Sequence, residues 1–269
     1  QQTVQYLHSQ GVNKIIALTH LGHAQDLELA SVVRGIDVIV GGHSHTVLDD
    51  YPILVRPADG PPVVVVTAHE RGQLLGRLDI TFTQEGQVAR VDGRLIPVDA
   101  GISQDDSMLE LLAGYDRAVA DLMMSIVGAT DVPLDGSRER VRSSETALGN
   151  LVCDAMLWKT RSLGTTVALQ NGGGLRASIP RGMITMAHVL DVLPYGNQIA
   201  VLPLRGEELR AALEHGVSGV EEASGRFLQV SGLRYTYDPS SPVGERILAV
   251  EIWDPISSSF LPLEPDLLV

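Results

Sequence analysis

Short apolar runs and a helical pattern alternate in the first part of the chain. Residues 14–19 and 36–40 are mostly apolar runs of strand length, and residues 24–34 between them have a helical pattern. Strand, helix and strand in this order predict a parallel pair of buried strands. The chain therefore opens with the pattern of an α/β unit.

The next elements extend this unit. A further apolar run at 63–67 predicts another buried strand. Alternating apolar positions at 75–82 and 88–96 predict two strands that are joined by a hairpin turn at 84–87.

The second half of the chain mixes helical and strand patterns. A helix at 104–125 joins the halves, and Ser143, Ser144 and Glu145 have the composition of a helix start. We expect a first domain at 1–98, a linker with the bridging helix at 99–126, and a second domain at 127–269. The remaining predicted elements are strands at 165–169, 199–204, 227–237, 247–253 and 267–269 and a helix at 207–215.

Three histidines follow the first two predicted strands. His20 comes at the end of the first, and His43 and His45 come after the second, past Gly41 and Gly42. The carboxyl ends of parallel strands are where ligands bind in such sheets, so we expect the imidazoles to gather there. In an extended loop the rings of an H-x-H pair face one side, and imidazole suits a divalent transition metal. A lone strand-end histidine is more often structural, whereas three at one sheet edge favour a metal site.

A second group of candidate residues surrounds a glycine-rich loop. Three glycines, Gly172 to Gly174, follow a predicted strand and permit positive φ angles, which would present backbone amides to a ligand. Asn171 and Arg176 flank them, and Arg176 adds a forked cation. A flexible turn is the alternative interpretation of such a loop.

Two further motifs are compatible with this loop. Arg138, Arg140 and Arg142 would point one way on an extended segment, although a solvated charge run is the alternative. Tyr195 stands beside the turn that contains Asn197, where a ring could stack for about 1–3 kcal/mol, although a surface tyrosine is the alternative. Together the motifs indicate a pocket for an anion and a ring.

Composition limits the function. A net charge of −13 argues against binding a nucleic acid polymer through its backbone. No apolar run approaches the roughly 20 residues of a membrane span. The single cysteine, Cys153, lies in a helical apolar pattern, which predicts a buried, inert thiol.

Five motifs in order resemble one family. ALTHLG, GGHSH, RVRSSETALGNLVCDAM, NGGGLR and LPYGN are similar to the 5′-nucleotidase family of two-domain metallophosphoesterases, and the likeness covers essentially the whole chain. The resemblance implies the C-terminal part of a calcineurin-like αββα metallophosphoesterase domain, followed by a mixed α/β nucleotide-binding domain. It also implies two divalent ions (Zn, Mn, Mg or Co) and metal-dependent hydrolysis of nucleoside 5′-phosphates.

The resemblance also assigns roles to residues. His20 and His43 would ligate one ion, and His45 the other. The residues that would contact the nucleotide are Arg138, Arg142, Asn171, Gly173, Arg176, Tyr195 and Asn197.

The chain departs from the family pattern at both ends. The family's D-x-H motif, bridging aspartate and G-N-H-[DE] motif are absent, as are its second clamp aromatic and its G-G-D-G motif. We therefore expect no catalytic residue in this chain, and we interpret it as a fragment that is inactive alone. The resemblance implies an extracellular, periplasmic or cell-surface location, and the oligomeric state is open.

Two alternatives to a 5′-nucleotidase remain at this point. The first is another branch of the same family, such as a UDP-sugar hydrolase, a 2′,3′-cyclic-nucleotide phosphodiesterase or a thiohydrolase of sulfur oxidation. The second, from a different class, is a catalytically dead nucleotide-binding module.

Overall fold

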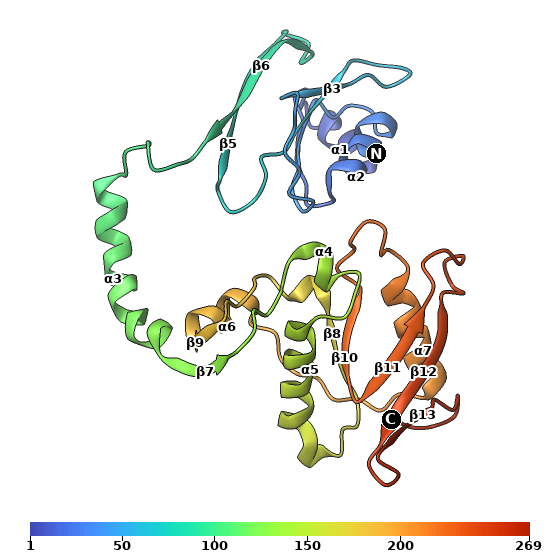
Figure 1. The fold of residues 1–269 in the computed structure, drawn as a ribbon. Coiled ribbons are helices and arrows are strands. Elements are labelled where there is room, and N and C mark those ends of the chain that lie inside the picture. The colour runs from blue at the N-terminus through green and yellow to red at the C-terminus, as the bar shows by residue number, and fades with distance from the viewer. The chain divides into compact units, whose positions relative to one another are not determined.

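The computed structural model describes residues 1–116 and 119–269. The chain divides into two compact units, Gln1–Leu109 and Glu110–Val269, and each is described by itself (Figure 1). Helix α3 (Asp106–Met124) crosses the division. In the described part of the chain no helix is long and apolar enough to span a membrane.

A four-stranded sheet forms the centre of the first unit. Its order is β1-β2-β4-β3, in which the first three strands are parallel and β3 is antiparallel. The parallel pairing predicted for the first two apolar runs is confirmed. The strands are β1 (Ile16–Leu18), β2 (Val38–Val40), β3 (Ile53–Val55) and β4 (Val63–Val66).

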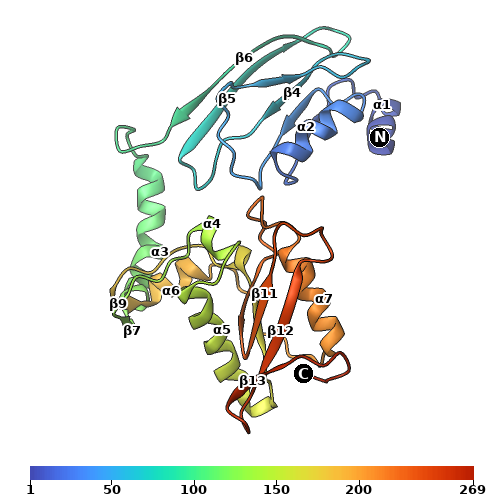
Figure 2. The ribbon, with the colours of Figure 1, turned by 45° about the vertical axis from the view of Figure 1, so that its right-hand side comes forward.

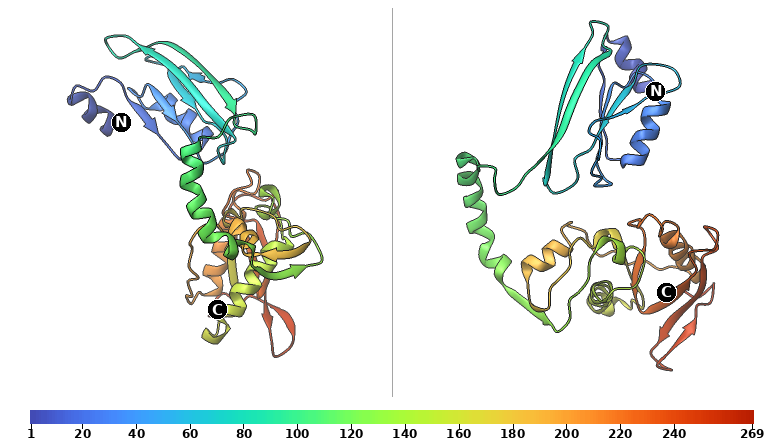
Figure 3. Two further views of the ribbon diagram at one scale, coloured as in Figure 1. Left: turned by 90° about the vertical axis from the view of Figure 1, so that its left-hand side faces the viewer. Right: turned by 45° about the horizontal axis from the view of Figure 1, so that its top comes forward.

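Different layers cover the two faces of this sheet. Helices α1 (Gln2–Ser9) and α2 (His23–Val32) pack on the face that carries Ile39 and Val65. The predicted hairpin, β5 (Leu74–Phe82) and β6 (Val88–Pro97), packs on the face that carries Val64 (Figure 3). Every residue of β4 is buried because both faces are covered.

A buried carboxylate connects the ends of the first two strands. Asp26, in the first turn of α2, is 1% exposed, and Thr19 Oγ1 donates to its Oδ1 at 2.7 Å. A Cβ at Gly41, just after β2, would collide with Asp26 Oδ2. Glycine at this position lets the main chain pass directly over the carboxylate.

The second unit is a mixed α/β structure with several small sheets (Figure 2). Its antiparallel pairs are β7 with β9 and β8 with β10, and β11, β12 and β13 form a three-stranded sheet. The strands are β7 (Ile126–Thr130), β8 (Ala168–Asn171), β9 (Gly182–Thr185), β10 (Leu228–Ser231), β11 (Leu233–Tyr237), β12 (Ile247–Asp254) and β13 (Ser259–Pro262). The helices are α4 (Arg138–Val141), α5 (Ala147–Thr160), α6 (Met186–Val192) and α7 (Gly206–Val217), and two 3₁₀ turns are η1 (Arg161–Leu163) and η2 (Gly172–Gly174).

Two apolar clusters stabilise this unit. Helix α7 packs Leu209 and Leu213 against Val250 of β12. Around α5, Leu148 packs with Leu175 and with residues of β9 and α6. Cys153 on α5 is fully buried, as its helical pattern predicted, and burial raises the pKa of its thiol to about 12.

A buried glutamine anchors the segment before α5. Gln229 of β10 is 2% exposed, and its Nε2 donates to Val141 O at 3.0 Å and to Ser144 O at 2.7 Å. Its Oε1 accepts a hydrogen bond from Thr146 N at 3.1 Å. The whole amide is therefore used to hold residues 141–146 in one conformation.

Three predicted strands of this unit differ in the structure. Residues 199–204 are irregular rather than a strand, and the predicted strand at 267–269 is reduced to an isolated bridge between Arg205 and Leu268. The predicted strand at 227–237 is two strands, separated at Gly232, whose φ of 77° breaks the extended run. An apolar run cannot indicate these features, because each depends on the strand that is available as a partner.

Replacing Gly41 with alanine tests the contact between the main chain and Asp26. The added Cβ would collide with a buried carboxylate that Thr19 holds by a hydrogen bond, so we expect a loss of about 1–3 kcal/mol in the free energy of unfolding. Urea unfolding, monitored by circular dichroism, measures this change in the free energy of unfolding. Gly114→Ala is the control, because its Cβ meets nothing within 4 Å and should be neutral or stabilising. Equal midpoints for Gly41→Ala and the wild type would contradict the contact.

Replacing Gln229 with glutamate tests the anchor of residues 141–146. The change keeps the shape but points a carboxylate oxygen at two carbonyl groups, so we expect a loss of about 2–4 kcal/mol. Tryptophan fluorescence during urea unfolding reports on this unit, because Trp158 and Trp253 both lie in it. The exposed Gln198→Glu is the matched control, and similar stability of the two variants would refute the anchoring role.

Candidate functional site

His20 and His43 lie together at the carboxyl edge of the parallel sheet. Their rings are edge-to-face, with centroids 5.0 Å apart and planes at 69°. The backbone is close as well, because a Cβ at Gly42 would lie 3.1 Å from His20 Nδ1. The double-glycine segment thus approaches His20 closely, and this lets the two imidazoles come into contact.

His45 has a different environment. Its Nδ1 lies 2.7 Å from Glu70 Oε2, in the loop after β4. His43 and His45 have φ angles of 75° and 56°, so both histidines are in the left-handed region and the H-x-H segment is not extended as predicted. The prediction was wrong because the spacing of two histidines does not reveal the backbone conformation between them.

The histidines of this edge form a pair and a separate third residue. Among the described residues, no group of three or more His, Cys, Asp or Glu side chains is placed to hold a metal ion. The donor chemistry nevertheless fits divalent transition metals, because two imidazoles converge and the third is oriented by a carboxylate. The first unit thus offers a partial set of candidate ligands.

Three further residues at this edge were not predicted from the sequence. Asp26 supports Thr19, Glu70 contacts His45, and His69 Nδ1 donates to the His45 carbonyl oxygen at 2.8 Å. His69 is not among the site residues that the sequence predicts. Its position soon after the third parallel strand was the available signal, because the same rule about strand ends applies there.

The arginines of the second unit lie on one turn of helix instead of an extended segment. Arg138 begins α4 and is exposed, whereas Arg142, just after α4, is only 6% exposed. The prediction that all three arginines of the R-x-R-x-R run point one way on an extended strand is therefore wrong. A single turn of helix turns Arg142 inward because Val141 and the Gln229 anchor hold the main chain behind it.

Arg142 is a buried cation with an unused donor. Its Nη1 donates to Ala223 O at 3.3 Å, and its buried Nε has no hydrogen-bond partner. Burial, followed by repulsion from Arg138 and Arg176, lowers the pKa of Arg142 to about 10. A guanidinium that is desolvated and close to two other cations favours an anion beside it.

The glycine loop runs next to Arg142. Gly172–Gly174 form the 3₁₀ turn η2 without positive φ angles, so the predicted reason for these glycines was wrong. The glycines are instead needed for close packing, since a Cβ at Gly172 would collide with Val141 O. Asn171 Nδ2 donates to Gly225 O at 3.1 Å, and Arg176 Nη1 donates to Gly173 O at 3.4 Å. The structure therefore brings Asn171, Gly173 and Arg176 together near Arg142.

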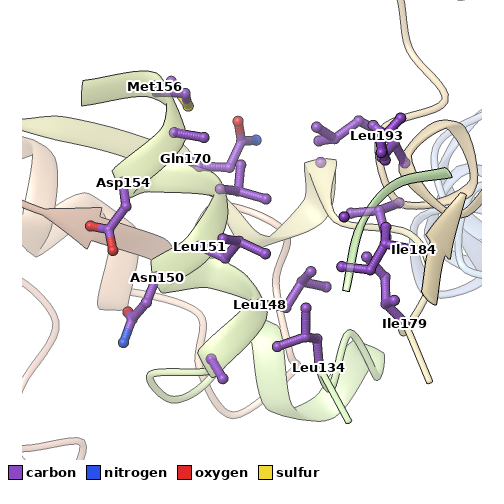
Figure 4. Close-up of a pocket in the computed structure, with 18 of the residues that line it drawn as sticks. Leu134, Leu148, Asn150, Leu151, Asp154, Met156, Gln170, Ile179, Ile184 and Leu193 are labelled. Atoms are coloured by element: carbon purple, nitrogen blue, oxygen red, sulfur yellow. The ribbon is translucent and has the colours of Figure 1, made fainter. Parts of the chain in front are cut away.

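Tyr195 and Asn197 follow α6 on an irregular, exposed segment. Both line a pocket of about 980 Å³ within the second unit, where Leu151 of α5 lies opposite Ile184 and Leu193 (Figure 4). The walls are mainly apolar, and Arg138, Arg142 and Arg176 are not among the residues that line them. Tyr195 is 52% exposed, so part of its ring is accessible beside this pocket.

Known proteins resemble this chain over most of its length. The trifunctional nucleotide phosphoesterase protein of Bacillus subtilis is 43% identical over 247 residues, which are 91% of this chain and 17% of that protein. A snake venom 5′-nucleotidase of Naja atra is 33% identical over 265 residues, which are 90% of this chain and 50% of the venom enzyme. The chain thus spans about half or less of the length of these relatives.

A solved structure agrees with these relatives. The crystal structure of a 5′-nucleotidase precursor from Thermus thermophilus matches all of this chain and 55% of its own, with a TM-score of 0.83 and 44% identity. This likeness confirms the predicted fold class, part of a metallophosphoesterase domain followed by a mixed α/β domain. The 5′-nucleotidase C-terminal domain family matches residues 126–266. The chain therefore belongs to the 5′-nucleotidase family.

Proposed function

We propose that the protein containing this chain hydrolyses nucleoside 5′-phosphates to a nucleoside and phosphate. The observation that carries the proposal is the buried guanidinium of Arg142, which has an unpartnered Nε and lies near Arg138 and Arg176. A phosphate would accept that unused donor and offset the repulsion between three cations. Membership of the 5′-nucleotidase family supports the same substrate class.

The substrate-contacting residues would act from the second unit. Arg142 and Arg176 would stabilise negative charge on the phosphoryl oxygens, with Arg138 adding to the positive potential. Asn171 and Gly173 would fix the conformation of the glycine loop, where Asn171 already bonds to Gly225. The exposed ring of Tyr195 would stack on the base, and Asn197 would contact the base edge.

The metal-binding residues would act from the first unit. His20 and His43 would hold one divalent ion, supported by the contact of their rings, and His45 would hold a second. When bound, such ions lower the pKa of a water molecule and neutralise charge on phosphate. The candidate ions are Zn, Mn, Mg and Co. Imidazole ligands suit Zn best, whereas Mg and Mn prefer oxygen ligands. Because the described residues contain no group of three ligands, we expect that this chain alone does not catalyse.

One alternative activity has support from a relative. The Bacillus subtilis relative is named a trifunctional nucleotide phosphoesterase, which supports a cyclic-nucleotide phosphodiesterase as the second candidate. A UDP-sugar hydrolase is an alternative from the family resemblance alone. A panel of AMP, 2′,3′-cyclic AMP and UDP-glucose with the full-length protein separates these activities. The venom relative supports a secreted location, which we propose as extracellular, periplasmic or cell-surface.

Phosphate release from AMP tests the proposed activity. With Mn²⁺ or Zn²⁺, we expect release by a version of this chain that is extended at both ends and none by the chain alone. The reason is that three imidazoles do not complete a two-metal site. Release by the chain alone would show that the ligand set proposed above is wrong, and no release by either form would refute the activity.

The Arg142→Ala variant of the full-length protein tests the anion site. Loss of the desolvated cation should lower kcat/KM for AMP by about 10²–10³-fold, with KM raised and kcat lowered. The exposed Arg161→Ala in the same unit is the matched control and should behave as the wild type. Unchanged kinetics for Arg142→Ala would remove Arg142 from the proposed mechanism.

A further inference from the structure

The loop after β4 contains a carboxylate that faces a candidate metal ligand. Glu70 Oε2 lies 2.7 Å from His45 Nδ1, and both side chains are mostly shielded, with 29% and 27% exposure. Arg71 Nε lies 3.9 Å from the same oxygen, so the carboxylate also has a cation beside it. A shielded carboxylate at this distance from a ring nitrogen is a charge-assisted hydrogen bond.

Two further hydrogen bonds join this loop to the loop after β2. His69 Nδ1 donates to His45 O at 2.8 Å, and His69 N donates to Thr46 O at 3.2 Å. The segment after β1 is also bonded to the loop after β2, because His23 N donates to Ser44 Oγ at 3.0 Å. The main chain on both sides of the His45 side chain is therefore held by the loops that follow neighbouring strands.

The backbone of the two loops is also unusual. His45, His69 and Arg71 have φ angles of 56°, 62° and 56°, a region that non-glycine residues seldom occupy. Such conformations persist only where the surrounding structure holds them, and they are concentrated at functional sites. These conformations occur at His45 itself and at the two residues that flank Glu70.

The hydrogen bond to Glu70 decides which nitrogen of His45 carries the proton. A neutral imidazole has one N–H donor and one nitrogen with a lone pair. A carboxylate accepts only from N–H, so in the neutral ring the proton is held on Nδ1 and the lone pair is on Nε2. Coordination by His45 would therefore use Nε2, in the carboxylate–histidine–metal arrangement found at many metal sites.

We propose that Glu70 is a positioning residue that fixes the tautomer and ring orientation of His45 for metal binding through Nε2. His69 supports it by holding the main chain of His45. This proposal rests on the assignment of His45 as a metal ligand in the proposed function. It adds two residues, Glu70 and His69, that act through His45 rather than on the substrate.

The first test reads the tautomer directly in the metal-free chain. In a two-dimensional ¹H–¹⁵N spectrum of ¹⁵N-histidine-labelled protein, we expect the His45 signals of an Nδ1–H tautomer, assigned by their loss in His45→Ala. Glu70→Ala should shift His45 towards a mixture with the Nε2–H tautomer. Glu70→Gln keeps an acceptor oxygen and should largely retain the wild-type pattern.

A matched control separates this effect from a general change in folding. Glu28 is an exposed carboxylate on α2, so Glu28→Ala should leave the His45 signals unchanged. An Nε2–H tautomer in the wild type, or an unchanged tautomer in Glu70→Ala, overturns the proposal. This result does not depend on a metal ion, so it can fail or succeed independently of the proposed function.

The second test measures Zn²⁺ affinity of the full-length protein by calorimetry. Glu70→Ala should weaken binding at one site by about 10–100-fold, which is typical for the loss of a residue that orients a ligand. Glu70→Gln should weaken it less, and Glu28→Ala should have no effect. His45→Ala should abolish binding at that site.

The variants distinguish the two hypotheses. If His45→Ala weakens Zn²⁺ binding and Glu70→Ala does not, the positioning role of Glu70 is wrong while the ligand assignment stands. If His45→Ala leaves both sites intact, the ligand assignment itself is wrong, and the metal-directed role of Glu70 is overturned with it.

Discussion

The parallel pairing of β1, β2 and β4 is the constraint on which the candidate metal residues depend. Parallel strands end at the same edge, so the loops that follow them must share a small region. His20, His43 and Glu70 each belong to one of these loops. The chain separates them by up to 50 residues, and the register of three short strands brings their loops together.

Close backbone packing is the second constraint, and it operates in both units. Gly41 passes over the buried Asp26 carboxylate, and Gly172 passes the Val141 carbonyl group, each without space for a Cβ. Because glycine has no side chain, the loop can approach a buried polar group, and this contact fixes the conformation of the loop. In the second unit Gln229 adds hydrogen bonds that hold the segment leading to Arg142.

The two groups of candidate residues have different chemistry, although neighbouring loops orient both of them. Around Arg142, an unused buried donor and repulsion between cations indicate that an anion is the expected ligand. At the sheet edge, two imidazoles are in contact, and a third is held by a carboxylate. In both places polar groups are already oriented by neighbouring loops, which lowers the cost of ordering them when a ligand binds.

The sequence by itself determined the strand, helix and strand at the start of the first unit with their parallel pairing, the hairpin, the buried thiol of Cys153 and, through five motifs in fixed order, the family. Apolar periodicity carries this information because burial along a strand or helix is a local property. Only the tertiary structure decided that residues 199–204 are irregular, that Arg138 lies on a helical turn, that the glycines of the loop serve close packing, and that Glu70 and His69 hold His45. Each of these depends on a partner that is distant in sequence: the strand available for pairing, the carbonyl group above a glycine, or the carboxylate beside a ring nitrogen. A linear pattern names the residues that can make such contacts, whereas the fold selects the contacts that form.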